Sequence, residues 1–487
     1  MLDGKRSTMM RKIERLAALS SPKVLLPEGT DLESAELAHD YQSIGAQGTN
    51  HVTNKLMLAL FRPSAPFFKL GLDSDTAKQA AEAGVDEAQL AGILASAEMR
   101  AVKQLDVGQH RPKLYQALRH LVVAGNVLLD LTSGMRVMGL RYYCIKRDIQ
   151  GTMKTLVIRE SVPFEELEDK VKESLPNKYT EESQVAYYKL IQKVGDEYKM
   201  TCWVDTVRLP SEFDSKWSLD KCPYLALTWD LADEANYGTG LVEEYVGDLE
   251  AVSALSESVV TGAVQASEYR WMVDPTGMTT VDDFNRSKNG DALPGRGEDV
   301  QAVNSGNDKA ISVSSEVAGT YEQRISRGFL LGSSVTRNAE RVTAEEVRLT
   351  ANELEIAYGG VYSTLAASLQ LPIAKWLLKS SDLDIAGTKL EISIVTGLGA
   401  ISRGGDLENL RLALADLAQI AQFPPVLQAR MKWTPIIAYV GQGRGIDLTP
   451  FFMTDTEFNA MQEKGMQDRV QESTMTAAGE TAATGAA

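Results

Sequence analysis

Two segments with helical periodicity, separated by a turn-rich insert, constrain the fold of this chain more than any other feature. In Leu241–Glu268 apolar side chains recur every three or four residues, which over about 28 residues predicts a helix of about 42 Å. Lys309–Phe329 repeats the pattern, with apolar residues four apart. The insert, Tyr269–Asn307, is too small to have much core of its own. We therefore predict two antiparallel helices lying side by side, with the insert at their tip.

Small residues give the first of these helices a thin surface, which allows close approach to a neighbouring helix at some cost in helix propensity. They are Gly247, Ala251, Ser253, Ala254, Gly262 and Ala266. The insert begins with a strand-like YRWMV segment, continues through a polar stretch rich in Gly and Pro, and ends with VQAV. This composition predicts a small module of strands and turns.

A loop and a long capped helix follow the second helix. Gly332–Ala339 is a loop by composition, and Thr343 with Glu346 forms a capping box. We predict a helix over Ala344–Gln370 with a kink at Gly359–Gly360, an interruption at Pro372 and a shorter helix beyond it.

The remainder of the chain predicts a mixed α+β body in which helices predominate. Helical spacing covers Thr53–Phe61, Glu87–Leu105 and Lys113–Leu131. Alternating patterns predict strands over Leu140–Arg159, with a turn at Asp148–Gly151, over Gln184–Leu209, broken near Gly195, and over Lys389–Val395. Residues 471–487 are of low complexity and are predicted to be disordered.

Composition is that of an ordinary globular protein, with 44% hydrophobic and 24% charged residues. Its 487 residues can bury a large core without disulfides. Cys144, Cys202 and Cys222 are odd in number and lack CxxC spacing, which predicts inert thiols in a reducing compartment. No apolar run approaches the length of a membrane span, so no membrane partner is expected.

Catalytic and cofactor motifs are not found. No P-loop is present, since Gly387-Thr388-Lys389 lacks the upstream glycine. The Gly397–Gly405 loop lies between a predicted strand and helix, but its spacing does not suit a dinucleotide. Acidic pairs and histidines show no metal-ligand spacing and are better explained as solvated turns and single side chains; these are Asp73/Asp75, Asp282/Asp283, Asp382/Asp384, His39, His51, His110 and His120. We predict no cofactor, no metal and no enzymatic activity.

The net charge of −16 disfavours avid binding of nucleic acid by a monomer. In a ring, however, an acidic wall would let a duplex slide, and basic positions repeated in every subunit would form belts of positive charge. The candidate positions are Arg337, Arg341 and Arg348 around the loop, and Arg286, Lys288 and Arg296 in the insert. The alternative for each is an ordinary solvated surface charge.

Six segments, in the family's order, resemble the portal proteins, or head-to-tail connectors, of short-tailed podoviruses. They are KLMLALF (Lys55–Phe61), LVVAGNVLL (Leu121–Leu129), EEYVGDL (Glu243–Leu249), ERVTAEEVR (Glu340–Arg348), GGVYSTL (Gly359–Leu365) and TGLGAISRG (Thr396–Gly404). The resemblance implies a homo-oligomer of about twelve subunits at one capsid vertex, through which double-stranded DNA enters during packaging and leaves during ejection.

The same resemblance implies the partners and the places of assembly. A separate terminase large subunit would drive packaging, and the major capsid protein, a scaffold, tail adaptor and nozzle proteins and internal core proteins would contact the ring. The protein would reside in the virion and, during assembly, in the host cytoplasm. The alternatives are a tail adaptor or other virion ring protein, which would lack two helices bracketing an insert, and a cytoplasmic nucleotide-binding enzyme that uses the Gly397–Gly405 loop.

The resemblance also implies a division of the chain into the parts of a portal subunit. These are an N-terminal wing part at 1–238, a first stem helix at 239–268, a clip at 269–307, a second stem helix at 308–330, a tunnel or valve loop at 331–343, a C-terminal wing part at 344–430, a crown at 431–470 and a disordered tail at 471–487. Arg341, in the valve loop, is the first choice for a residue that touches DNA.

Overall fold

The computed structural model describes most of the first 396 residues and short stretches thereafter. The described residues are 6–27, 29–30, 40–61, 66–72, 87–176, 179–180, 183–304, 308–332, 353–354, 356–381, 390–394, 412–419, 435–437 and 439–440. The chain divides into two compact units, Met1–Thr396 and Gly397–Ala487. In the second unit, helical residues at 412–419 bring Ala413 and Leu417 into contact with Ile436, Ile437 and Val440.

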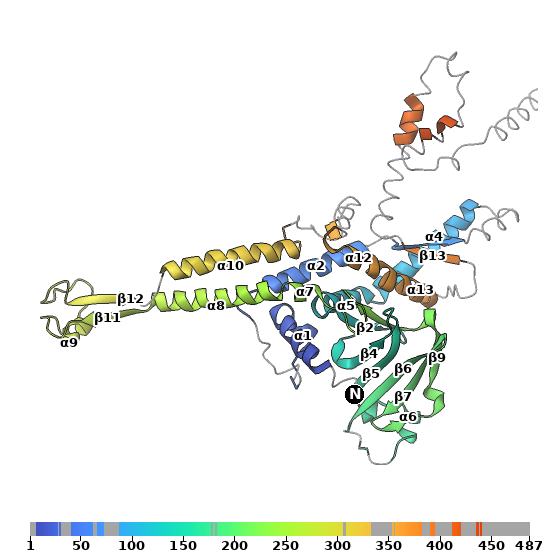
Figure 1. Cartoon of the computed structure of the whole chain (residues 1–487), viewed down its shortest axis with the longest axis horizontal. Helices are drawn as coiled ribbons and strands as arrows, with labels where there is room; N and C mark the ends of the chain where they lie inside the picture. Colours follow the sequence, from blue (N-terminus) through green and yellow to red (C-terminus); the bar gives the residue numbers. More distant parts are fainter. Residues whose placement is uncertain are drawn as a thin grey trace, which may run out of the picture. The chain divides into compact units, whose positions relative to one another are not determined.

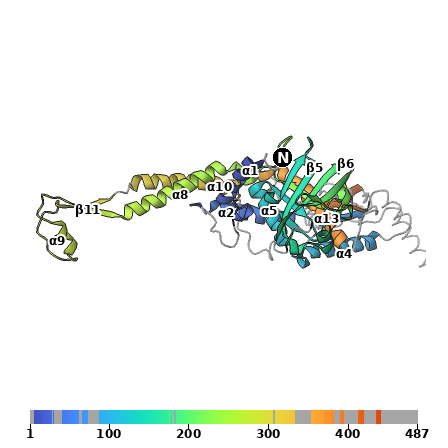
Figure 2. The ribbon, with the colours of Figure 1, turned by 90° about the horizontal axis from the view of Figure 1, so that it is seen from below.

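Helices form much of the body of the first unit, and α5 lies at its centre (Figures 1 and 2). The helices are α1 (Ser7–Leu19), α2 (Ile44–Leu60), α4 (Glu87–Val107), α5 (His110–Ala124), α6 (Asp169–Glu173), α12 (Gly360–Leu365) and α13 (Leu371–Ser380). Leu114, Leu118 and Leu121 of α5 are fully buried at helical spacing, and α1, α2 and α4 pack around them. Short 3-10 turns lie at Pro22–Val24, Leu140–Tyr142, Phe164–Glu166, Ser211–Phe213 and Leu219–Lys221.

A six-stranded antiparallel sheet carries most of the β-structure. Its strands are β4 (Tyr143–Arg147), β5 (Met153–Pro163), β6 (Gln184–Val194), β7 (Glu197–Val204) and β8 (Val207–Arg208), with β9 (Ser215–Ser218) paired to β7. The predicted turn between β4 and β5 is present. Asp148 Oδ1 accepts from the amides of Gln150 and Thr152 at 3.0 and 2.8 Å, and Gly151 takes a φ of 78°.

Two smaller sheets bring distant segments together in the body. In the first, the order is β10 (Tyr224–Thr228), β2 (Asn126–Asp130) and β3 (Arg136–Met138). In the second, β1 (Phe68–Leu72) pairs antiparallel with β13 (Leu390–Ile394), so that Phe68 lies opposite Ile394. β13 confirms the strand predicted over Lys389–Val395.

The helix predicted over Lys113–Leu131 is wrong in its second half. α5 ends at Ala124, because Gly125 adopts a φ of 68° and caps the helix by donating to the Leu121 carbonyl at 2.9 Å. A Cβ at Gly125 would lie 2.3 Å from the Thr239 carbonyl carbon, so this close approach requires glycine. The next residues form β2, buried on both faces, and an apolar run of that kind fits a buried strand as well as a helix.

The prediction that Pro372 interrupts the helix is wrong. α12 passes through a π-helical turn, Ala366–Gln370, directly into α13, and Pro372 occupies the first turn of α13. Proline is tolerated where the local bonding pattern changes, because its missing N–H is not needed there. The kink predicted at Gly359–Gly360 is present, with Gly359 at a φ of 40°.

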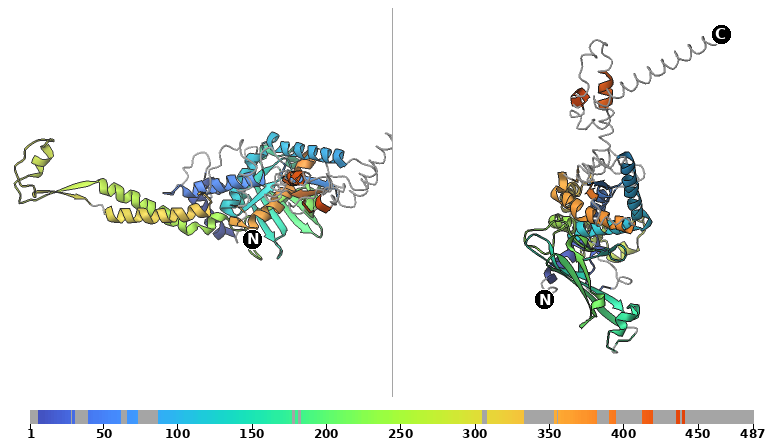
Figure 3. Two further views of the ribbon diagram at one scale, coloured as in Figure 1. Left: turned by 90° about the horizontal axis from the view of Figure 1, so that it is seen from above. Right: turned by 90° about the vertical axis from the view of Figure 1, so that its right-hand side faces the viewer.

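Two antiparallel helices extend from the body and carry a small β-module at their far ends, as predicted (Figures 1 and 3). They are α8 (Val246–Ser267), preceded by the short α7 (Leu241–Glu244), and α10 (Asp308–Gly328). We call α8 and α10 the helical hairpin. The tip module, Tyr269–Asn304, contains β11 (Tyr269–Val273), α9 (Val281–Arg286) and β12 (Val300–Asn304). The first predicted helix is thus divided at Tyr245, and the short α9 lay outside the predictions.

Candidate functional site

The two helices of the hairpin pack closely where one of them has no side chain. A Cβ at Gly262 on α8 would lie 2.9 Å from Ile311 Cγ1 on α10, which confirms the expected close approach. Near the body, Leu249 and Val252 of α8 and Ile325 of α10 are fully buried. Beyond Ser253, α8 has no buried residue in the described chain. The outer half of the hairpin therefore has little core of its own.

Valines on that outer half face solvent in the isolated chain. Val260 and Val264 on α8 are 52% and 55% exposed, and Val313 and Val317 on α10 are 59% and 39% exposed. Single exposed apolar residues are common, but several on one short hairpin indicate a surface that another protein covers. Burial of each half-exposed valine would contribute about 1 kcal/mol.

The tip module is held by hydrogen bonds around one carboxylate. β11 and β12 pair from Tyr269 opposite Asn304 to Val273 opposite Val300. Asp299 Oδ2 accepts from the amides of Arg296 and Met278 at 3.0 and 3.2 Å. These bonds, the Arg296 amide first, hold the pKa of Asp299 below its usual range.

Apolar side chains are also exposed on the tip module. Trp271, Met272, Met278 and Val281 are each more than half exposed, although Trp271 packs against Phe284 with ring centroids 5.1 Å apart. A module with so little core and so much exposed apolar surface is suited to contact with copies of itself or with another protein.

The predicted basic positions of the insert all lie on the tip module. Arg286 is the last residue of α9, while Lys288 and Arg296 lie in the polar segment before β12, and all three side chains are exposed. The backbone amides of Lys288 and Arg296 donate to Asp291 and Asp299, so their backbone positions are fixed. Arg337, Arg341 and Arg348 lie outside the described residues, as does the Gly397–Gly405 loop.

The root of the hairpin joins it to the body through aromatic packing. Phe329, fully buried after the end of α10, lies against the backbone of α2, where a Cβ at Gly48 would be 2.7 Å from the Phe329 ring. The Tyr245 ring lies 5.2 Å from that of Phe329, and the Tyr358 hydroxyl donates to the Gly328 carbonyl at 3.0 Å. The hairpin therefore meets α2 and the segment before α12 at one joint.

Two arginines beside this joint lay outside the sequence predictions. Arg324 and Arg327 line a hollow of about 450 Å³ together with Glu244, Tyr245 and Tyr358. Arg324 forms an ion pair with Asp248 at 3.5 Å and lies 4.8 Å above the Tyr321 ring. The sequence carried one signal for these two arginines. They lie three residues apart at the end of a predicted helix, and cations are favoured at helix C-termini.

Helix α2 also holds the chain on both sides of the predicted valve loop. Lys55, almost completely buried, pairs with Glu353 at 2.6 Å. One turn earlier, His51 is hydrogen-bonded to the Leu330 backbone, while burial, the larger effect, lowers its pKa. The last residues before the loop and the first described residues after it are thus tied to one helix.

The remaining chemistry in the described part of the chain is limited. No group of three or more His, Cys, Asp or Glu side chains is placed to hold a metal there, and no helix there is both long and apolar enough to cross a bilayer. The three cysteines form no disulfide with one another, and burial raises the pKa of Cys202 and raises that of Cys222 to about 11, which keeps these two thiols protonated. Asp282 and Asp283 are exposed in the first turn of α9, while the other acidic pairs lie outside the described residues.

An elongated two-helix arm with a β-tip, rooted in an α+β body, is the architecture of a structural assembly subunit. Comparison with known proteins agrees with that class. Residues 1–451 match the family described as bacteriophage head to tail connecting protein. The portal protein of Enterobacteria phage T3 is 31% identical, with 96% of this chain and 89% of that protein covered. The portal protein of Escherichia phage T7 is 30% identical with the same coverage, and that of Enterobacteria phage SP6 is 29% identical over 97% and 92%.

Solved structures give a weaker likeness. A chain from the virion of a native gene transfer agent particle aligns with a TM-score of 0.40 at 10% identity, covering 83% of this chain and 89% of that one. The sequence comparisons are sufficient by themselves: this chain belongs to the bacteriophage head-to-tail connecting protein family. It is a head-to-tail connector of a phage virion, as the resemblance in its sequence predicted.

Proposed function

We propose that about twelve copies of this chain close into a ring whose central channel carries double-stranded DNA into and out of the capsid at one vertex. The observation that supports this most directly is the row of exposed valines on the helical hairpin, which has too little core to stand alone. Neighbouring hairpins in a closed ring would cover one another's valines without leaving a free end.

In this proposal the parts of the chain keep the boundaries given by the sequence. The body forms the wing, the helical hairpin the stem, the tip module the clip, residues 331–343 the valve loop and residues 431–470 the crown. The role is structural and not catalytic. A terminase large subunit and then tail adaptor and nozzle proteins attach to the ring, while the major capsid protein, scaffold and internal core proteins contact its other surfaces. Assembly takes place in the host cytoplasm.

Charge explains how such a channel could pass DNA without holding it. With 66 acidic and 50 basic residues per chain, the ring repels phosphate over most of its surface. Arg337, Arg341 and Arg348 near the valve, and Arg286, Lys288 and Arg296 on the clip, would form belts that contact the backbone of the duplex. Binding would be independent of DNA sequence and would weaken steeply with salt.

Imaging of the purified protein tests the ring, and stem variants test its basis. Wild-type protein should give rotationally symmetric annuli in negative stain. Val264→Glu with Val313→Glu should abolish them, because charges would replace apolar contacts at every interface. The matched control, Ser258→Glu with Ser315→Glu, adds the same charge at exposed polar positions of the same helices and should assemble normally. Annuli from the valine variant would contradict the proposed stem contact, and a monomeric wild type would contradict the ring.

Genome retention tests the valve. Arg341→Ala and Arg341→Glu should assemble normally but lose packaged DNA, whereas Arg341→Lys, which keeps the charge, should retain most of it. Nuclease-resistant DNA per particle is the measurement. Wild-type retention by both the Ala and Glu variants would remove Arg341 from the valve.

A further inference from the structure

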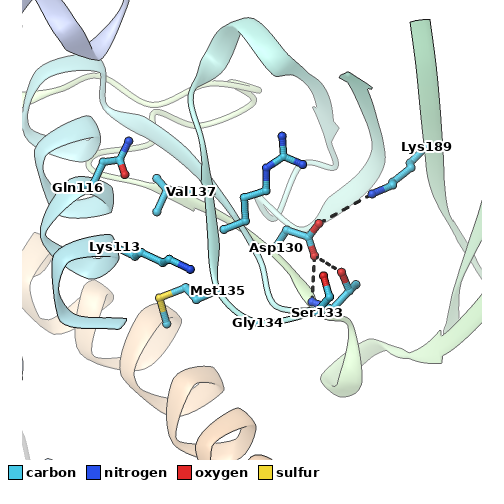
Figure 4. A pocket seen from close by; sticks show the side chains of 10 residues that line it. Lys113, Gln116, Asp130, Ser133, Gly134, Met135, Val137 and Lys189 are labelled. Carbon is cyan, nitrogen blue, oxygen red and sulfur yellow. Dashed lines mark hydrogen bonds and ion pairs between the residues drawn. The ribbon is translucent and has the colours of Figure 1, made fainter. Parts of the chain in front are cut away.

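A polar cleft in the body, apart from the helical hairpin, is lined by three cationic side chains. It is a hollow of about 460 Å³ between α5 and the β2–β3 hairpin, with β6 alongside. Figure 4 shows Lys113 and Gln116 of α5 facing Met135 and Val137, with Lys189 across from Asp130. Arg136 completes the cationic set.

The charges around the cleft do not cancel. Lys189 pairs with Asp130 at 4.0 Å and with Glu160 at 3.5 Å, and Arg136 also pairs with Glu160. The three cations Lys113, Arg136 and Lys189 are thus accompanied by only two carboxylates of the described residues, those of Asp130 and Glu160. Lys113, exposed on α5, forms no ion pair with another described residue. A cationic cleft in a chain of net charge −16 is suited to a carboxylate ligand.

The wall of the cleft opposite α5 is a rigid turn. Asp130 Oδ1 accepts from the amide and the hydroxyl of Thr132 at 3.0 and 2.7 Å. Gly134 takes a φ of 111°, and a Cβ there would meet open space. Because the wall is fixed before anything binds, a ligand would not have to order it.

The same chain carries an acidic surface of complementary charge. We call it the acidic ridge, and it comprises the exposed residues Glu165, Glu166, Glu168, Asp169 and Glu173. Of these five, only Asp169 forms an ion pair within the described residues, with Lys172 at 3.7 Å. Lys170 and Lys172 lie in the same segment, which leaves the ridge with an excess of three negative charges.

The acidic ridge has an ordered backbone that is held in place by apolar packing. Leu167, Val171 and Leu175 pack with strands β6 and β7 in a small core of their own. Phe164 stacks on Tyr179 with ring centroids 5.5 Å apart, and the Val171 amide donates to the Glu168 carbonyl at 2.8 Å. The carboxylates are therefore presented on a fixed surface.

The cleft and the ridge of one chain cannot meet. The ridge precedes the start of β6, and Lys189 lies five residues further along that strand, about 17 Å at the usual rise. Figure 1 shows α6 at the free end of the sheet, away from α5 and β2. A closed ring requires two different, complementary patches on each subunit. Separate patches of opposite charge on one compact body meet that requirement.

We propose that the cleft of each subunit binds the acidic ridge of the neighbouring copy, as a second, electrostatic contact between wings. This inference rests on the proposed ring. It assigns Lys113, Gln116 and Lys189 to the contact with Glu165, Glu166 and Glu168 of the next subunit.

Charge reversal on each side tests the contact. The cleft variant carries Lys113→Glu and Gln116→Glu, both exposed on α5, and the ridge variant carries Glu165→Lys, Glu166→Lys and Glu168→Lys. Each alone should raise the concentration needed for ring assembly on the order of tenfold at low salt, because like charges would face each other at every interface. An equal mixture of the two should assemble again, since alternating copies present opposite charges at every contact.

A matched control and the wild type make the result decisive. Lys154→Glu with Gln192→Glu changes the charge by the same amount on exposed positions of β5 and β6 and should assemble like wild type. Restored rings in the mixture, and a weaker defect in 0.5 M salt, would support the contact. Normal assembly of both reversed variants, or equal loss in the control, would overturn it. Failure of wild type to form rings would instead contradict the proposed function.

Discussion

Phe329 is predicted to be the residue that fixes the helical hairpin to the body. It is fully buried, lies on the backbone of α2 at Gly48 and contacts the Tyr245 ring. Phe329→Ala removes this packing and leaves a cavity, at a cost of about 3–5 kcal/mol. If the substitution lowers the free energy of local opening of the joint by this amount, amide exchange at the end of α10 should accelerate by about 100- to 4,000-fold.

Gly48, on the other side of this contact, supplies an independent check. A Cβ at this position would lie 2.7–2.9 Å from three atoms of Phe329, so Gly48→Ala should destabilise the wild type through overpacking, by about 1–3 kcal/mol before a gain of up to about 1 kcal/mol in helix propensity. In the Phe329→Ala background the two ring contacts are gone, and only the contact with the Cβ of residue 329, at 2.9 Å, remains. There the same substitution should cost less than in the wild type, because the cavity left by the ring gives the remaining methyl groups room to shift.

Hydrogen exchange of the four proteins, read by mass spectrometry on peptides from α2 and the end of α10, measures this cycle. Exposed Gly247, where a Cβ would meet no atom within 4 Å, provides Gly247→Ala as a control that should behave alike in both backgrounds. The reasoning is refuted if Gly48→Ala costs as much in the Phe329→Ala background as in the wild type, because the contact with the Phe329 ring would then not govern the joint.

Three further predictions concern buried charge, pH and the tip module. Glu353→Gln should lower the melting temperature more than Lys55→Met, because it removes the Glu353 carboxylate and keeps the buried Lys55 charge, a loss of about 2 kcal/mol or more; equal shifts in differential scanning fluorimetry would contradict this. Burial lowers the pKa of His120 to about 4, so the unfolded chain takes up its proton below about pH 6.5 while the folded chain does not. Stability should therefore fall between pH 6.5 and 4 by about 3 kcal/mol for this group, and His120→Leu should flatten that part of the curve; an unchanged slope in chemical denaturation would refute it. Asp299→Ala should lower the exchange protection factors of the Met278 and Arg296 amides, and because the Asp299 pKa is depressed, acid below about pH 4 should lower the same protection factors in the wild type. Asp282→Ala, on the same module, should leave these amides unchanged.

Patterns that depend on neighbours within a few residues were read correctly from the sequence. The hairpin, the strands YRWMV and VQAV, the Asp148–Gly151 turn and the kink at Gly359 all follow from local periodicity or from glycine's access to positive φ. The errors arise where a local pattern fits two structures. The run from Leu121 to Leu131 fits the apolar spacing of a helix and that of a strand, so spacing did not show that the helix ends at Gly125, which caps it and docks against Thr239 and Gly240.

The candidate surfaces also differ in how far the sequence alone could predict them. The basic positions of the tip module were visible because they lie in one short segment, whereas the cleft gathers Lys113, Asp130 and Lys189 from three separate elements. No spacing rule joins such residues, and none links Lys55 to Glu353, which lie 298 residues apart. The signal for the acidic ridge, five carboxylates in nine residues, was present in the sequence, but the ordered surface that presents them was not.

The amino-acid sequence by itself determined the family, the helical hairpin with its β-tip, and the acidic balance of the chain, because each is encoded in composition or in contacts between near neighbours. Only the tertiary structure decided where α5 ends, how Phe329 joins the hairpin to α2, and which charges from distant segments share a cleft. Those features depend on which faces dock together, and the free energy of docking comes from packing and desolvation across the whole body, which no local pattern specifies.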